Sequence, residues 1–495
     1  MQKINKVDTV AIVGGGTSAW LTAAMLSHTI PHLKVIVVDK EVGTPVGVGE
    51  GTLLSFTQVM NRCGFKMEEW FFAIDATYKS AILFPGWGEN QTDVWHPFMF
   101  EEFGTYSTTL LNCWSKNQDL DFKTHGLNLF DVSVNHDKVD PVAGSCYAFH
   151  IDASKLVHFI QSKLEMRPQV SVIRSEVVDI TRNDSNHNIE YLTLKNGSTV
   201  NADVYVDCTG FKGLLGYEPD RVDLTGRLWC DTAIAGHVPY ADRDKELHPY
   251  VISEQVEHGW VWNIPVQSRI GSGLVFNRSC TDIEEAKKFF CEYWDNRITP
   301  DKVKVIDWTP YYNRNPWHEN VVSIGLSNGF IEPLESTGIA LIIAGVEQLT
   351  FALEARFYTE EHVKYFNILM SNFFEDAIDF VSMHYVNPTR EGKIWDLVRS
   401  TFKKSPRMEF YESEILKTDR KLPVKGTGYM FCASNWNCWL VQLGYPMAPA
   451  MDCIPEDISR QLILNHVATV ENVRHLTSPG HIEYINSFKD FLNSR

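Results

Sequence analysis

The first forty residues carry the hydrophobic pattern of a strand, a helix and a second strand. The short apolar run from Val7 to Val13 is typical of a buried parallel strand, and three glycines follow it. Residues 18–27 have helical composition, and a second apolar run, Lys34 to Val38, ends at Asp39. This order predicts a βαβ unit, in which two parallel strands are joined by a crossover helix.

The rest of the chain changes from a strand pattern to a helix pattern near Gly338. Residues 168–207 and 225–280 contain short runs of β-branched and aromatic residues, and these runs favour strands. Beyond that glycine, residues 339–385 carry apolar residues at helical spacing, and residues 410–495 also favour helix. We therefore predict an α/β (α+β) fold with a nucleotide-binding core and a largely helical C-terminal part.

Two domain arrangements fit this pattern. Either residues 1–345 form the core, with β-rich segments inserted, and residues 346–495 form the helical part, or both belong to one compact domain. The length of 495 residues is compatible with both arrangements. Hydrophobic residues make up 44% of the chain, so a sizeable core can form.

The net charge of the chain limits which kinds of binding partner we expect. Lys and Arg number 45 against 62 Asp and Glu, a net charge of −17, which argues against a nucleic-acid surface because such a surface needs a basic stripe. The N-terminus lacks a signal-peptide pattern and no apolar stretch is long enough to cross a bilayer, so we expect a cytoplasmic protein without a membrane partner. The ten cysteines show neither a C-x-x-C pair nor zinc spacing, so we expect reduced thiols and no metal.

A glycine pattern, Gly14-x-Gly16-x-x-Ala19, connects the first strand to the first helix. A dinucleotide needs a tight turn there, then bare backbone against its pyrophosphate, then a small residue for packing of the helix on the strand. The helix N-terminus supplies amide donors, and an acidic residue at the end of the next strand usually binds a ribose hydroxyl. A glycine turn without ligand is the alternative. The candidate dinucleotide contacts are Gly14, Gly16, Thr17, Ser18, Ala19 and Asp39.

Two further stretches of the sequence are candidates for additional contacts to a dinucleotide. Alternate glycines in Val46 to Thr52 suggest backbone folded tightly against a flat ligand, although a flexible loop has the same pattern. Val204 to Gly210 is a strand that runs into a Thr-Gly turn, or an ordinary strand end. These stretches add Gly47, Gly49, Thr52 and Gly210 to the candidate cofactor contacts.

A tryptophan motif, W-x-W-x-I-P, is the most specific pattern in the chain. It comprises Trp260, Trp262, Ile264 and Pro265. On a strand, both tryptophans and the isoleucine point to one face because side chains alternate. Two core tryptophans on an ordinary strand are the alternative.

Together these motifs resemble those of the flavin-dependent halogenases of tryptophan-halogenase type. In that family the glycine turn and W-x-W-x-I-P occur together, and the resemblance extends from Val7 to about Tyr445. It includes GVGEGT, the string from Phe330 to Gly338 (FIEPLESTG) and the His384-Tyr385 stretch. The resemblance implies an FAD-binding Rossmann-like core of the flavin monooxygenase type and a helical substrate-binding part.

The chemistry that this resemblance implies occupies two compartments. Reduced FAD (FADH2), oxygen and a halide ion as co-substrate give hypohalous acid in one compartment. The acid travels through the protein to a second compartment, which holds an electron-rich aromatic substrate such as an indole or phenol. The W-x-W-x-I-P residues lie between the compartments in the family and act as a partition. Chloride, bromide and iodide all stay open.

The two chemical residues of the family map to Lys79 and Glu335. Lys79 precedes an apolar stretch. Its ammonium would polarise hypohalous acid, or its neutral amine would form a haloamine. The alternative is an ordinary lysine on the protein surface. Glu335 would orient the electrophile and take the ring proton; a carboxylate that only complements a helix dipole is the alternative. Ser336 would assist in linking the compartments. The backbone amides of Thr337 and Gly338, at the start of a helix, would bind halide.

The resemblance to the family is weaker at the substrate site. His96 and Phe98 resemble the family's aromatic sandwich around the substrate ring, although either residue also suits the core. We assign Trp436 to the same site. Relatives that take free tryptophan have a pair of tyrosines where this chain has residues 435–438, Asn-Trp-Asn-Cys. Free tryptophan is therefore in doubt as the substrate.

Two departures concern the flavin. Gly325 is a further candidate cofactor contact, but related hydroxylases carry Asp after it and this chain has Leu326. No separate NAD(P)H-binding βαβ unit is evident, so a partner flavin reductase would supply FADH2. The runner-up activity is an FAD-dependent aromatic monooxygenase on the same fold, which consumes NAD(P)H itself and needs no halide. A non-catalytic flavin-binding protein is the third alternative, and homo-oligomerisation stays open.

Overall fold

The computed structural model describes most of the chain in two compact units. The described residues are 4–40, 48–98, 110–111, 113–122, 125, 147–215, 220–386, 388–417, 429–445, 454–477 and 480–494. Each unit combines three separate stretches of sequence. Unit 1 comprises Met1–Asp75, Ile151–Thr225 and Trp308–Glu375, and unit 2 comprises Ala76–His150, Gly226–Asp307 and Asp376–Arg495.

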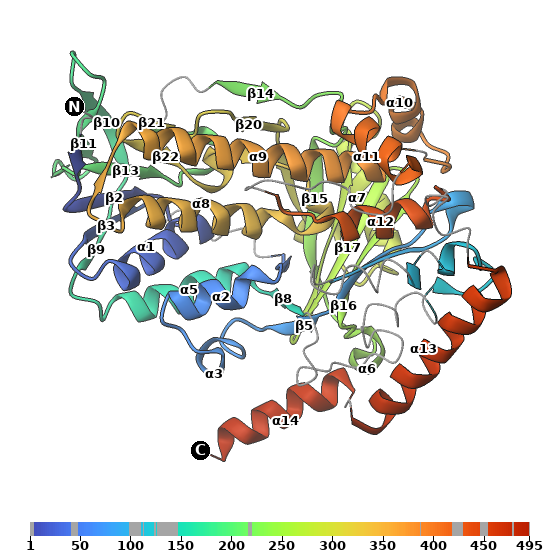
Figure 1. Ribbon diagram of the computed structural model, residues 1–495. Helices are drawn as coiled ribbons and strands as arrows, with labels where there is room; N and C mark the ends of the chain where they lie inside the picture. The colour runs from blue at the N-terminus through green and yellow to red at the C-terminus, as the bar shows by residue number, and fades with distance from the viewer. Residues whose placement is uncertain are drawn as a thin grey trace. The chain divides into compact units, whose positions relative to one another are not determined.

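A six-stranded sheet forms the centre of unit 1 (Figure 1). Its strand order is β21 (Trp317–His318), β22 (Val321–Ser323), β13 (Val204–Asp207), β2 (Thr9–Val13), β3 (Lys34–Asp39) and β9 (Val170–Arg174). The pairings from β22 to β9 are parallel, and only β21 runs antiparallel to its neighbour. The predicted βαβ unit is thereby confirmed, with α1 (Thr17–Thr29) as its crossover helix.

Helix α1 packs between other helices of unit 1. It contacts α5 (Ala153–Leu164) and α8 (Thr337–Leu353), and α2 (Ser55–Arg62) lies against both α1 and α8. The residues of α1 from Thr17 to Ser27 are all buried because the helix is covered by the sheet and by these helices. Helix α3 (Met67–Trp70) follows α2. Parallel sheets bury both faces in this way, which explains why their strands are apolar throughout.

Smaller sheets surround this core in unit 1. Their strands are β10 (Val177–Arg182), β11 (Ile189–Leu194) and β12 (Thr199–Val200); β14 (Arg221–Asp223), β20 (Tyr311–Asn313) and β23 (Gly329–Phe330); and β1 (Asn5–Lys6) with β24 (Phe357–Tyr358). The short strand β4 (Glu50–Gly51) precedes α2. The helix α9 (Glu360–His384) begins in unit 1 and ends in unit 2.

A seven-stranded sheet forms the centre of unit 2. Its order is β19 (Lys304–Asp307), β15 (Thr232–Val238), β18 (Arg269–Phe276), β17 (Gly259–Val266), β16 (Tyr250–Val256), β6 (Ala81–Phe84) and β7 (Val94–Pro97). All neighbours are antiparallel except β16 and β6. Helix α7 (Ile283–Tyr293) covers β15 and β18 with an apolar face. Beside this sheet, β5 (Thr77–Lys79) pairs antiparallel with β8 (Ala148–Ile151).

Helices make up the C-terminal part, as the sequence predicts. They are α10 (Lys393–Thr401), α11 (Pro406–Lys417), α12 (Ala433–Gln442), α13 (Glu456–Thr477) and α14 (His481–Asn493), with the short α6 (Arg243–Glu246) earlier in the unit. Helix α12 packs on β7. Within the ranges described above, no helix is both long and apolar enough to cross a membrane.

Candidate active site

The glycine turn between β2 and α1 is shaped by two different constraints. Gly14 has a φ of +142°, and a Cβ there would collide with the carbonyl oxygen of Cys208. A Cβ on Gly15 would collide with the carboxylate of Asp39. Gly16, the N-cap of α1, has nothing within 4 Å of its Cβ position. The first two glycines are therefore required by the protein's own packing, whereas the third leaves space in front of the helix N-terminus.

Asp39 ends β3 and is held by an arginine from the neighbouring strand. Arg174 is its register partner on β9 and donates from Nη1 to Asp39 Oδ2 at 2.5 Å. The Arg174 guanidinium also lies over the Trp20 ring, 5.7 Å from its centroid. The sequence-based reasoning found Asp39 but missed Arg174. The only available signal was that both residues end apolar runs, which places them at the same edge of a parallel sheet.

Two other segments reach this turn. Gly325 has a φ of +79°, and its missing Cβ leaves room for Ser18, whose own Cβ would lie only 2.8 Å away. Asp207, at the end of β13, accepts hydrogen bonds from the Thr209 backbone (3.0 Å) and hydroxyl (2.6 Å), and these bonds shape the turn that leads to Gly210. The structure therefore brings Ser18 and Gly325 together. Thr17 and Ala19 lie in the buried first turn of α1.

The glycine-rich stretch after β3 is described only in part. Gly47 lies outside the described residues, whereas Gly49 has a φ of +89° and Thr52 is fully buried. Between them, loss of hydration and the nearby Asp152 carboxylate raise the pKa of Glu50 to about 7. Glu50 was missed as a candidate, although a charged residue between two glycines of a ligand-binding motif was a usable signal.

The string Pro333–Gly338 leads from a short 3₁₀ turn into α8. Glu335 is buried at the end of a short 3₁₀ turn, and Ser336 adopts the left-handed conformation with a φ of +58°. Helix α8 then begins at Thr337, whose buried hydroxyl has no hydrogen-bond partner among the described residues. The first turn of α8 contains no acidic residue, and Gly338 has open space at its Cβ position. Such a helix N-terminus attracts an anion.

Lys79 lies on β5 of unit 2 and is fully buried. Its ammonium nitrogen is 5.2 Å from the centroid of the Phe98 ring, within the range of a cation–π contact. The alternative that Lys79 is a surface lysine is therefore wrong. Two residues earlier on the same strand, the Thr77 hydroxyl lies 2.9 Å from Nδ1 of the buried His150, which sequence reasoning missed.

The W-x-W-x-I-P residues lie on β17, where the period of a strand places Trp260, Trp262 and Ile264 on one face. Both tryptophans are buried, with ring centroids 6.1 Å apart. Trp262 lies over Gly273 of the neighbouring strand, where a Cβ would collide with its ring. The carbonyl oxygen of Pro265 accepts a hydrogen bond of 2.6 Å from the Thr77 hydroxyl. A hydrogen bond thus connects the motif to the strand that carries Lys79.

His96 belongs to an aromatic cluster in unit 2. Its ring lies 5.4 Å from that of Phe380 on α9, and Phe431 stacks on Phe380 with centroids 3.9 Å apart. Trp436 is also buried and packs edge-on against Phe380 at 5.1 Å. The amide of Asn435 donates to Nε2 of His96 at 2.9 Å. Because the Cys432 backbone N–H binds the other atom of that amide, Oδ1, the Asn435 orientation is fixed.

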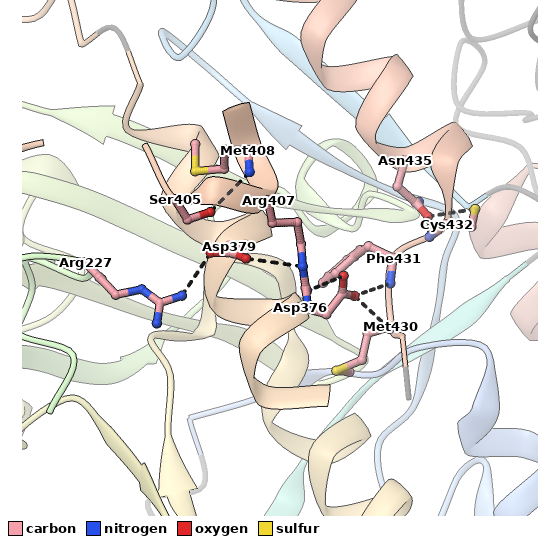
Figure 2. Close-up of polar contacts among 10 residues, drawn as sticks. All are labelled: Arg227, Asp376, Asp379, Ser405, Arg407, Met408, Met430, Phe431, Cys432 and Asn435. Carbon is pink, nitrogen blue, oxygen red and sulfur yellow. Dashed lines mark hydrogen bonds and ion pairs between the residues drawn. The ribbon is translucent and has the colours of Figure 1, made fainter. Parts of the chain in front are cut away.

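A buried carboxylate anchors the segment that carries Phe431. Figure 2 shows Asp376 of α9 between Arg407 and the backbone N–H groups of Met430 and Phe431. These N–H groups donate to its Oδ2 at 2.9 and 3.0 Å, and Arg407 lies 3.3 Å from its Oδ1. Burial outweighs these contacts and raises the pKa of Asp376 to about 6. One turn later, Asp379 pairs with Arg227 at 2.9 Å. Sequence reasoning missed this anchor.

Comparison with known proteins decides the family. The model of the tryptophan halogenase family matches residues 9–456, which is most of the chain. The chain belongs to the tryptophan halogenase family. The predicted family and enzyme class, a flavin-dependent halogenase, are thereby confirmed.

Two named relatives of this halogenase align with most of the chain. The tryptophan 6-halogenase ThaL of Streptomyces albogriseolus is 29% identical over 424 residues, 79% of this chain and 78% of the relative. The tryptophan 7-halogenase RebH of Lentzea aerocolonigenes is 29% identical over 419 residues, with 79% and 78% covered.

Solved structures agree with the fold. The flavin-dependent halogenase BrvH of Brevundimonas sp. BAL3 superimposes with a TM-score of 0.83 at 25% identity, covering 98% of this chain and 99% of that one. A flavin-dependent halogenase from Xanthomonas campestris gives a TM-score of 0.88 at 23% identity, with 98% of both chains covered, and supports the fold alone. The predicted α/β fold class is therefore confirmed.

The candidate residues of this halogenase divide between the units. Unit 1 carries the glycine turn, Asp39, Gly325 and the string that contains Glu335. Unit 2 carries Lys79 and the W-x-W-x-I-P motif, together with His96, Phe98 and Trp436. Among the described residues, no group of three or more His, Cys, Asp or Glu is arranged to hold a metal ion.

Proposed function

We propose that this protein uses FADH2, oxygen and a halide ion to halogenate an electron-rich aromatic compound such as an indole or a phenol. The observation that carries the proposal is Lys79, a fully buried lysine against an aromatic ring in a chain of this family. Lysines are rarely fully buried, and buried ionisable groups are concentrated at functional sites. The other observations concern how each unit would serve that chemistry.

The residues of unit 1 fit FAD. The open space at Gly16 faces the N-terminus of α1, where backbone amides would hold the pyrophosphate. Asp39 would accept a hydrogen bond from the ribose hydroxyl while Arg174 holds its carboxylate in place. Gly49, Thr52 and Gly210 would make further contacts to the cofactor. When bound, reduced FAD supplies the electrons for the reduction of oxygen that accompanies oxidation of halide to hypohalous acid.

The N-terminus of α8 would hold the halide. The backbone amides of Thr337 and Gly338 begin a helix that has no acidic residue in its first turn, and they would favour an anion. Ser336, which adopts the left-handed conformation, separates the buried Glu335 from these amides in the chain. This arrangement is consistent with the roles of Glu335 and Ser336 that the family resemblance implies.

Unit 2 would direct the electrophile and hold the ring. The Lys79 ammonium would donate a hydrogen bond to the oxygen of hypohalous acid and so make the halogen more electrophilic. His96, Phe98 and Trp436 would hold the aromatic substrate. The buried W-x-W-x-I-P residues would keep flavin chemistry away from it. The carboxylate of Glu335 would take the ring proton after the halogen has added.

A reconstituted assay tests the proposal. Purified protein with FAD, a generic flavin reductase, NADH, oxygen and each halide in turn is incubated with a panel of indoles and phenols, and products are identified by mass spectrometry. We expect halogenated product that requires halide, reductase and oxygen together. Hydroxylated product without halide, or rapid NADPH oxidation without added reductase, would instead support an aromatic monooxygenase. Localisation in the cytoplasm and supply of FADH2 by a partner reductase belong to this same proposal.

A further inference from the structure

His150 is a buried histidine whose protonation is fixed by its neighbours. The Thr77 hydroxyl lies 2.6 Å from the carbonyl oxygen of Pro265, which can only accept, so the single hydroxyl hydrogen is donated there. Towards Nδ1 of His150, at 2.9 Å, the same hydroxyl can therefore only accept. Nδ1 must carry a proton and donate it. In a neutral imidazole, Nε2 is then the atom with the lone pair.

The imidazole is held neutral by its surroundings. Burial is the main cause that lowers the pKa of His150 well below its ordinary value, and the positive charge of Lys79 is the next. His481 and His248 face it as well and act in the same direction, whereas the Pro265 carbonyl acts in the opposite direction. A second proton at Nε2 is therefore disfavoured, and Nε2 is a hydrogen-bond acceptor at neutral pH.

This acceptor has no protein donor within the described ranges. His150 is fully buried, and its Nε2 makes no hydrogen bond to any described residue. A buried acceptor left unsatisfied costs free energy, and such groups in native proteins usually meet water or a ligand. The position of Nε2 therefore indicates a small molecule with an O–H or N–H donor.

Strand register places this acceptor beside Lys79. Thr77 pairs with His150 and Lys79 pairs with Ala148, so His150 and Lys79 are diagonal neighbours across two antiparallel strands. Residues 77 and 79 point to the same face because side chains alternate, and a directly paired residue shares that face. Diagonal neighbours are about 7–8 Å apart, within reach of long side chains.

We propose that Nε2 of His150 accepts the O–H hydrogen of hypohalous acid while the Lys79 ammonium donates to the oxygen of the same molecule. The inference rests on the proposed function and adds a second catalytic residue to the lysine. Two contacts on one oxygen restrict how the acid can turn, whereas Lys79 alone leaves it free to rotate. With the O–H fixed, the halogen has a defined direction.

The proton balance of the step is complete. The O–X bond breaks as the halogen adds to the ring, and its electron pair stays on oxygen. That oxygen takes a proton from the Lys79 ammonium and leaves as water, still donating its original O–H to His150. The ring loses one proton and the Lys79 amine regains one, so the step neither consumes nor releases a proton overall. Hypohalous acid and arene thus give halogenated arene and water.

Two isosteres of histidine separate this role from a structural one. His150→Gln places an amide oxygen near the position of Nε2, and His150→Asn places its amide near Nδ1 but leaves the Nε2 position empty. We measure halogenated product per flavin oxidised, substrate KM, and hypohalous acid that escapes to monochlorodimedone in solution. His150→Asn should lose about 10–100-fold of product, with unchanged substrate KM and more escaped acid. His150→Gln should retain most of the product.

Opposite results would overturn the proposal. The proposal is wrong if His150→Asn keeps the normal product yield. It is also wrong if His150→Gln and His150→Asn lose product equally, because Nε2 then does not bind hypohalous acid. The same substitution at His158, an exposed residue of α5, is the matched control and should change nothing. If wild-type protein gives no halogenated product at all, the proposed function fails instead.

A measurement on wild-type protein covers the case in which a variant fails to fold. ¹⁵N-labelled histidine gives separate signals for protonated and unprotonated ring nitrogens, and the signal of His150 is the one that is lost in whichever of the two variants folds. We expect a protonated Nδ1 and an unprotonated Nε2 at neutral pH. A proton on Nε2 would remove the acceptor and with it the proposal.

Discussion

The Lys79 ammonium nitrogen lies 5.2 Å from the centroid of the Phe98 ring, and the lysine side chain is fully buried. An aromatic face compensates part of the loss of hydration of a cation. In such a buried setting, a hydrogen bond from the ammonium to an oxygen atom is stronger than the same bond in water. This relationship motivates the first prediction.

Lys79→Ala should abolish halogenated product while oxidation of reduced flavin by oxygen stays measurable. The loss should exceed the about 10²–10⁴-fold that one acid–base group usually contributes, because the electrophile is no longer directed. Lys79→Arg should not restore activity, since a guanidinium keeps the charge but has a different shape and stays protonated. Product by mass spectrometry and stopped-flow flavin spectra provide the measurement. Near-normal halogenation by a folded Lys79→Ala protein would remove Lys79 from the mechanism.

The glycines of the first turn should respond differently to substitution. Gly16→Val should fold and lose FAD binding, because its Cβ position is open in the protein but would occupy the pyrophosphate site. Gly14→Ala should instead destabilise the fold by about 2–4 kcal/mol, because it adds a collision with Cys208 at a strained φ. Urea unfolding and FAD titration distinguish the two effects. Unchanged FAD affinity in Gly16→Val would refute the assignment.

Glu335→Gln should be milder than Lys79→Ala. The amide can still hydrogen-bond from the same buried position at the end of the 3₁₀ turn, but it can no longer take the ring proton as a carboxylate does. We expect a loss of about 10²-fold in product, at the low end of the range for one acid–base group, with flavin oxidation retained. A loss as large as that of Lys79→Ala would show that Glu335 does more than accept a proton.

The Asp376 anchor should make stability depend on pH. A carboxyl whose pKa is raised to about 6 in the folded protein contributes stability that is present in acid and is lost as the pH rises through that value. Between about pH 4.5 and 7.5, wild type should therefore lose about 2 kcal/mol of unfolding free energy relative to Asp376→Asn. Asp184→Asn, at an exposed turn, is the control. Parallel pH profiles of wild type and Asp376→Asn would contradict the burial of a charge there.

Free tryptophan should be a poor substrate compared with simple indoles. The stretch from Asn435 to Cys438 lacks the tyrosine pair associated with amino-acid recognition, and Asn435 is engaged by His96. Competition between tryptophan and indole in one reaction, analysed by mass spectrometry, gives the ratio of kcat/KM directly. A clear preference for tryptophan would overturn this expectation.

Local sequence patterns are sufficient to specify the individual strands and helices near the glycine turn. An apolar run, three glycines and a helical pattern specify β2, the turn and α1, because each constraint acts within a few residues. The helical character after Gly338 and the strand with Trp260 and Trp262 follow from periodicity for the same reason. Lys79 precedes an apolar stretch in the sequence, and the structure shows that it is buried.

The tertiary structure alone decided which residues meet across the chain. Arg174 reaches Asp39 over 135 residues, and Thr77 reaches Pro265 over 188. Asp376 holds Phe431 from 55 residues away. No local pattern encodes such pairs, because a hydrogen bond between distant segments depends on strand register and helix packing. The division of the chain into two units of three stretches each has the same origin, since long-range pairing decides which stretches pack together.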